Sequence, residues 1–219
     1  GSAYTYFKNE HLRGNTIDGY DLGDRPKEQN NVYGFTLGGP IIKDKLFFFI
    51  NGEYDSAPRP IFKWRLSNDG IGNDANLITR VTAQDMENFA QVLRSQYGYE
   101  PGSYTDYDAG EFTKKALARI DWNINNTNKL TLRYNFTGNK YTNPTSQSMP
   151  GSRTQHGHYS AASRPFRNSC YDMNNTVHSL TAELNTVLGN NMSNQFLGTL
   201  TLIKDERGSD SSPFPMVDI

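Results

Sequence analysis

The segment that decides the fold is Ala116–Phe136, which reads ALARIDWNINNTNKLTLRYNF. Apolar and polar side chains alternate along both of its halves, and Asn126–Asn128 lies between them. Alternation with a period of two is typical of a strand that has one apolar and one polar face, and asparagine is a common turn residue. The segment therefore predicts an antiparallel hairpin of two strands, over 115–125 and 129–140.

The same alternation recurs along the chain. Gly39–Lys45 and Leu188–Asn191 contain the turn residues of two further hairpins. The whole pattern predicts an all-β fold, an antiparallel meander of about seven strands. The expected strands cover residues 3–9, 31–38, 46–55, 115–125, 129–140, 176–187 and 192–205.

The links between these strands alternate in length. The three hairpin turns contain a few residues each, whereas the links 10–30, 55–113 and 143–173 are long and polar. Because short and long links alternate strictly, all the long links emerge at one end of the sheet. Loops of this length are uncommon in compact domains, but short periplasmic turns and long extracellular loops are typical of transmembrane β-barrels.

The longest link also predicts one short helix, over about 83–97. Thr82 can cap its start together with Asp85, and Gly98 can end it. Apolar residues at helical spacing form one stripe between these signals, which predicts that the helix packs the loop onto the rim of such a barrel. The stripe consists of Met86, Phe89, Ala90 and Leu93.

The composition excludes several classes of protein. The 219 residues include 22 basic and 23 acidic side chains, a balance that argues against a nucleic-acid-binding surface. The longest apolar run, Leu46–Ile50, is far shorter than the roughly 20 residues of a transmembrane helix. The single cysteine, Cys170, cannot form an internal disulfide. Catalytic and cofactor motifs are absent, so we expect no enzyme, no cofactor and no metal.

A membrane barrel presents one face of each strand to lipid and the other to a watery interior. The predicted strands provide this division, although a soluble β-sandwich would show the same alternation; the pattern of loop lengths favours the barrel. The residues expected to face the interior are Arg119, Asp121, Arg133 and Glu183. Seven strands cannot close such a barrel, so we expect the chain to be a piece of a longer one.

Four segments resemble one known family. Tyr33–Tyr54 is similar to a segment early in the barrel of TonB-dependent receptors. It is nearest to the Oar-like branch common in Bacteroidetes, whose members carry a carboxypeptidase-regulatory-like N-terminal domain. Gly1–Asn9 resembles the preceding strand, and Leu117–Asn125 and Lys129–Asn135 resemble the following hairpin. The resemblance implies a fragment from the early part of a 22-stranded barrel.

The resemblance also implies a location, a function and partners. It implies a transporter of the bacterial outer membrane that captures and takes up an unknown ligand, such as a nutrient, glycan or peptide. The implied partners are outer-membrane lipid, a plug domain, the remaining barrel strands and, through the full-length protein, TonB. Residues 1–219 contain neither a plug nor a TonB box.

The long loops supply the candidate ligand contacts, which are aromatic rings that can stack and basic side chains that can bind acidic groups. These candidates are Tyr97, Tyr99, Tyr104, Tyr107, Arg153, Tyr159, Arg164, Phe166 and Arg167. The alternative function is a surface-exposed β-domain that binds glycan or protein through the same loops without transport.

Three loop segments contain residue types that bind metal ions. His156 and His158 share a loop with Cys170, but their spacing matches no zinc motif. The Asp- and Gly-containing segments Asn68–Asp74 and Asp18–Asp24 loosely resemble calcium-binding turns and lack the ligand order of an EF-hand. A solvated polar loop is the simpler interpretation of the histidine segment, and ordinary Asp/Gly turns are the simpler interpretation of the other two.

Overall fold

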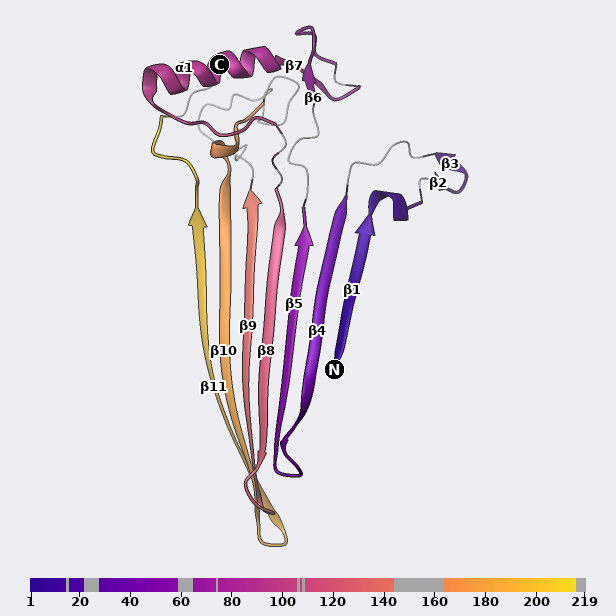
Figure 1. Cartoon of the computed structure of the whole chain (residues 1–219), viewed down its shortest axis with the longest axis vertical. Helices are drawn as coiled ribbons and strands as arrows, with labels where there is room; N and C mark the ends of the chain where they lie inside the picture. Colours follow the sequence, from indigo (N-terminus) through magenta and orange to yellow (C-terminus); the bar gives the residue numbers. More distant parts are fainter. Residues whose placement is uncertain are drawn as a thin grey trace.

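The computed structural model describes residues 1–14, 16–21, 28–58, 65–73, 75–105, 107, 109–143 and 164–215. Within these residues, seven strands form one antiparallel sheet in which each strand pairs with its neighbours in chain order. The sheet is the expected meander, with β1 and β11 at its open edges (Figure 1). Its strands are β1 (Ser2–Asn9), β4 (Gln29–Ile42), β5 (Leu46–Ala57), β8 (Glu111–Asn123), β9 (Asn128–Asn143), β10 (Tyr171–Leu188) and β11 (Met192–Gly208).

Several strands extend beyond their expected limits at the loop end of the sheet. Strand β10 begins at Tyr171, five residues before the predicted start at residue 176, and Asp172 still pairs with Thr142 of β9. Both faces of the sheet carry polar side chains there. The alternation of polar and apolar residues therefore ends before the hydrogen-bonded ladder does, and the sequence pattern underestimates the strand.

The predicted turn Gly39–Lys45 is wrong in its length. Strand β4 continues to Ile42, and Pro40 pairs with Phe47 across the ladder. The register shifts between Pro40 and Ile42, which marks an irregularity of the β-bulge type. Proline cannot donate to a ladder, but a bulge tolerates it. The chain reverses only at residues 43–45, where Asp44 has a φ of 60°.

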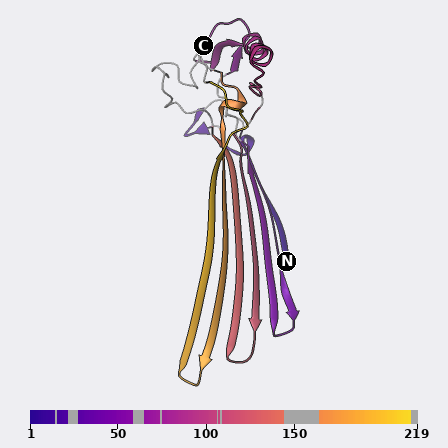
Figure 2. The same cartoon turned by 90° about the vertical axis from the view of Figure 1, so that its left-hand side faces the viewer.

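The two ends of the sheet differ completely. The three short turns lie together at one end, and the longer connections lie at the other (Figure 1). The loop end carries the helix α1 (Ala83–Tyr97), the short strands β2 (Thr16–Ile17), β3 (Tyr20–Asp21), β6 (Arg65–Ser67) and β7 (Ile78–Thr82), and the 3-10 turns at Glu10–Leu12 and Arg167–Ser169. Figure 2 shows that the sheet is a single layer, with these elements gathered beyond one end of it.

Helix α1 has the boundaries that the sequence predicts. The Thr82 hydroxyl accepts a hydrogen bond from the Asp85 backbone N–H at 3.1 Å, and the Asp85 carboxylate accepts one from the Thr82 N–H at 2.9 Å. Gly98 ends the helix in the left-handed conformation, with a φ of 61°. No helix in the described part of the chain is long and apolar enough to cross a membrane.

The apolar side of the sheet is the more exposed of its two sides. We call the side that carries Arg119 and Thr131 the polar face, and the side that carries Leu180 and Leu200 the apolar face. Thr131 is only 6% exposed, whereas Leu180 and Leu200 are 50% and 60% exposed. The buried apolar residues found within the described ranges all lie at the loop end. They are Met86, Ala90, Leu93, Pro101 and Cys170.

Candidate functional site

The predicted interior residues share the polar face of the sheet. Arg119 of β8 lies opposite Arg133 of β9, and Glu183 of β10 lies opposite Thr131. Residues that alternate along a strand point to the same side, so Asp121 joins Arg119 on this face. The ladder therefore brings the four predicted side chains from three neighbouring strands onto one surface.

A carboxylate anchors the charges on the middle of this surface. Arg119 Nη2 donates to Asp121 Oδ1 at 2.8 Å, and the Thr131 hydroxyl donates to the same oxygen at 2.8 Å. The Nε atoms of Arg119 and Arg133 are buried and have no hydrogen-bond partner in the described structure. Unpaired donors of this kind are costly when water is excluded.

A second polar cluster on the same face was missed by sequence reasoning. Glu53 of β5 accepts a hydrogen bond from the Tyr4 hydroxyl of β1 at 2.9 Å and binds the Lys115 ammonium of β8 at 2.8 Å. These residues lie 49 and 62 positions from Glu53 in the chain. Alternation could have placed each side chain on the polar face, but only the register brings them together.

The polar face also carries aromatic side chains. Phe49 lies opposite Arg119 and is 39% exposed, and Phe47 lies opposite Asp121. Exposed aromatic rings in direct contact with water are unfavourable. This part of the polar face is therefore suited to contact with another folded element rather than with bulk water.

The loop elements pack into a unit that we call the loop cap, formed by residues 65–73, 75–105, 107, 164–170 and 209–215. Tyr99 stacks on Phe214 with 4.2 Å between ring centroids, and its hydroxyl lies 2.7 Å from the Ser211 hydroxyl. Tyr97 meets the same ring edge-on. Two of the predicted ligand contacts thus bind the C-terminal segment to the end of α1.

Three more predicted contacts join the loop before β8 to the loop before β10. The Tyr107 hydroxyl donates to the Pro165 carbonyl at 3.0 Å, and Arg164 Nε donates to the Tyr104 carbonyl at 3.0 Å. Phe166 packs edge-on against Tyr104 and at a tilt against Phe89 of α1. These side chains hold the loop cap together, and their contact with a ligand stays a prediction.

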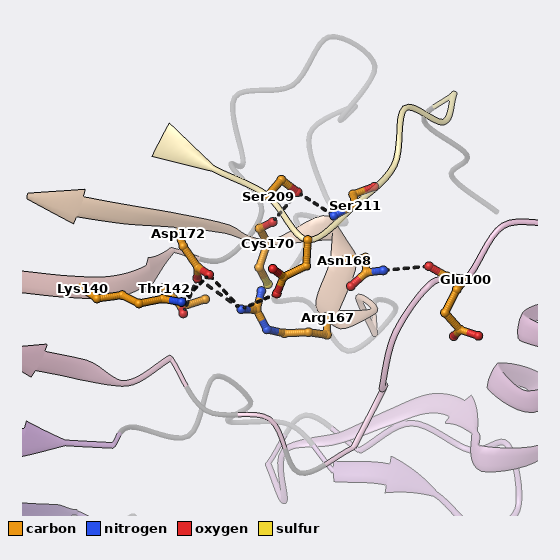
Figure 3. Close-up of polar contacts among 10 residues, drawn as sticks. Glu100, Lys140, Thr142, Arg167, Asn168, Cys170, Asp172, Ser209 and Ser211 are labelled. Carbon is orange, nitrogen blue, oxygen red and sulfur yellow. Dashed lines mark hydrogen bonds and ion pairs between the residues drawn. The ribbon is translucent and has the colours of Figure 1, made fainter. Parts of the chain in front are cut away.

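Arg167 occupies the centre of a charge cluster at the base of the loop cap (Figure 3). Its guanidinium lies 3.2 Å from Asp172 and 3.3 Å from Asp210, so it joins the start of β10 to the segment after β11. Asp172 is 5% exposed, accepts a hydrogen bond from the Thr142 hydroxyl and lies 3.3 Å from the Lys140 ammonium. The cluster fixes the loop cap to the ends of three strands.

The remaining loop predictions fall into two groups. Arg153, Tyr159, His156 and His158 lie outside the described residues. In the segment that loosely resembles a calcium-binding turn, the carboxylate of Asp69 accepts hydrogen bonds from the Ile71 N–H at 3.0 Å and from Ser67 Oγ at 2.8 Å. These bonds hold the pKa of Asp69 below its usual range. Among the described residues, no group of three or more His, Cys, Asp or Glu is placed to hold a metal ion.

The comparison with known proteins gives one match. Residues 1–59, which contain β1, β4 and β5, match the family described as "Outer membrane beta barrel domain". No curated protein and no solved structure matches the chain. The match agrees with an antiparallel sheet whose apolar side is the more exposed of its two sides. The chain therefore contains part of an outer-membrane β-barrel domain, and the protein is located in the bacterial outer membrane.

Proposed function

We propose that the chain is part of the barrel of a TonB-dependent transporter that captures and takes up a ligand. The observation that best supports this proposal is the difference between the two ends of the sheet, with short turns at one end and the packed loop cap at the other (Figure 1). In outer-membrane barrels the long loops are extracellular. The loop cap then lies at the cell surface, where ligand arrives, and we expect no enzymatic activity from it.

The polar face supports an occupied interior. An open pore lined by water needs only polar side chains, but this face carries Phe47 and Phe49 beside Arg119 and Arg133. The guanidinium groups of both arginines carry several N–H donors, to which an element inside the barrel can offer acceptors. A plug domain inside a 22-stranded barrel, completed by strands beyond β1 and β11, would supply both apolar cover and acceptors.

The alternative is a surface domain that binds glycan through its aromatic loops without transport. Such binding needs aromatic faces that are free to stack on sugar rings. Tyr99 already stacks on Phe214, and Tyr104 and Phe166 pack against each other. Except for Tyr97, which is 64% exposed, the aromatic candidates in the described loops are thus engaged in packing or hydrogen bonds within the loop cap, which argues against the glycan-binding alternative.

Uptake by cells that express the full-length protein tests the proposal. The probes are a fluorescent maltodextrin and a fluorescent tetrapeptide pool, each with and without a protonophore that collapses the inner-membrane gradient. A TonB-dependent transporter should accumulate at least one probe only while the gradient is intact, and a strain without TonB should lose that uptake. Gradient-independent uptake, or surface binding without entry, would contradict the proposal.

A further inference from the structure

A hollow lies at the short-turn end of the sheet, away from the loop cap. It has a volume of about 820 Å³ and is lined by residues of all three hairpins. Its floor includes a row of residues that pair with one another across neighbouring strands. The row consists of Asn123, Lys129, Asn185 and Gln195, on β8 to β11 in turn. Lys45 extends this row, because its carbonyl accepts a hydrogen bond from the Asn123 N–H at 2.8 Å.

The charge of this hollow is positive. Lys43, Lys45 and Lys129 line it, with Asp44 as the only acid among the lining residues. In the described structure none of these three ammonium groups forms an ion pair, whereas Lys8, Lys115, Lys140 and Lys204 elsewhere each have a carboxylate partner. The hollow therefore concentrates unpaired positive charge in one place.

The amides of the same row add hydrogen-bond acceptors. Asn185 Nδ2 and Gln195 Nε2 both donate to Glu183 Oε1, at 2.7 and 2.8 Å. The NH₂ group of each amide is therefore bound to Glu183, and the side-chain carbonyl oxygens of Asn185 and Gln195 stay available as acceptors. A ligand that complements the row needs N–H or O–H donors as well as negative charge.

We propose that this hollow binds an extended peptide segment that carries carboxylates. Adjacent strands are about 4.8 Å apart, so the row from Lys45 to Gln195 spans about 19 Å, the length of roughly six extended residues. In the polyproline II form of an extended peptide, with three residues per turn and a rise of about 3.1 Å per residue, carboxylates three positions apart lie on the same side. They are then about 9 Å apart, close to the two strand spacings between Lys45 and Lys129. The peptide N–H groups would donate to the amide carbonyl oxygens.

The position of the hollow at the short-turn end of the sheet indicates the compartment in which the partner binds. Short turns of outer-membrane barrels face the periplasm, so the peptide segment belongs to a periplasmic partner. The binding proposal does not depend on the transport of any ligand. Its success or failure is therefore distinguishable from that of the transporter proposal.

The test uses the full-length protein in detergent micelles and fluorescence anisotropy of a labelled hexapeptide with glutamates at its second and fifth positions. The affinity should fall about threefold for Lys45→Gln or Lys129→Gln and about tenfold for the double variant, since each exposed ion pair contributes modestly. The peptide with glutamines in place of both glutamates should bind about tenfold more weakly, and added salt should weaken the glutamate peptide.

Lys114→Gln is the matched control, because Lys114 is an exposed lysine at the loop end of the apolar face of β8. It should leave the affinity unchanged. Three results would overturn the proposal: no binding of the glutamate peptide, an equal loss of affinity for Lys114→Gln, or equal binding of the glutamine peptide. Displacement of the peptide by polygalacturonate at equal carboxylate concentration would also overturn it, because the site would then recognise an anionic glycan.

Discussion

In the sheet the apolar side chains are exposed, whereas in the loop cap they are buried. Leu180 and Leu200 of the apolar face are 50% and 60% exposed, but Met86 and Leu93 of α1 are each 5% exposed. The opposite burial of apolar side chains in the two regions reflects two different solvents, lipid around the sheet and water around the loop cap. Lipid accepts apolar side chains directly, so the wall of a barrel needs no apolar core. The loop cap lies in water and must bury its apolar residues against itself.

The two regions are also held together differently. The strands are joined by continuous ladders of backbone hydrogen bonds. Side-chain hydrogen bonds on the polar face, such as the one from Thr131 to Asp121, add only a minor contribution. The loop cap depends on individual contacts between distant segments, such as Arg167 with Asp210 and Tyr99 with Phe214. Backbone pairing tolerates the loss of one side chain, whereas a packed loop unit depends on each anchor.

The largest effect is expected where the wall meets lipid. Leu180→Arg should lower the free energy of unfolding by about 2–4 kcal/mol, the cost of an arginine near the middle of a bilayer. The measurement is urea unfolding of the full-length protein in lipid vesicles. In a soluble sheet the same change would be nearly neutral, because Leu180 is already half-exposed.

Ser179→Arg is the matched control, since Ser179 is the residue before Leu180 on β10, points to the polar face and lies opposite the uncharged Asn135 and Thr201. It should change the free energy of unfolding by less than about 1 kcal/mol. Equal effects of the two substitutions would contradict the assignment of the apolar face to lipid.

The same contrast explains what the sequence could predict. The wall follows from alternation within each strand, which is a local signal, and the boundaries of α1 follow from Thr82, Asp85 and Gly98. The contacts of the loop cap join residues far apart in the chain, such as Tyr107 with Pro165 and Tyr99 with Ser211. No local pattern encodes such partners, so the aromatic and basic loop residues could only be proposed as ligand contacts.

A smaller effect is expected at the base of the loop cap. Asp172→Asn removes the charge that faces Arg167, whose side chain is 19% exposed, and should weaken the local stability of the cap by about 1–3 kcal/mol. Hydrogen exchange should then accelerate in 164–170 and 209–215, while the middle of β9 and β10 keeps its protection. Uniform acceleration across the sheet would show that the cap and the wall unfold together.

Lys140→Gln provides the comparison for this prediction. Its ammonium also faces Asp172, but the Lys140 side chain is 55% exposed. Exposed ion pairs contribute about 0–1 kcal/mol, so this substitution should change exchange in the cap only slightly. An effect as large as that of Asp172→Asn would contradict the central role of Arg167.

The smallest effect is expected at the start of α1. Thr82→Ala removes the capping hydroxyl and should reduce hydrogen-exchange protection in the first turn of the helix about fivefold. The hydrogen bonds from the Thr82 side chain and backbone hold the pKa of Asp85 below its ordinary value. The Asp85 carboxylate therefore stabilises the helix fully at pH values above the ordinary pKa of an aspartate. This contribution is lost as the pH falls through the lowered pKa of Asp85 in the folded state.

Asp85→Asn should make the protection of this turn nearly independent of pH across the acidic range. The original chain should lose protection on acidification, whereas exchange in the sheet should not follow this change. Loss of protection at the same pH in both proteins would show that another group controls the helix start. A sheet that responded together with α1 would show that the cap transmits its local stability to the wall, against the separation of the two regions.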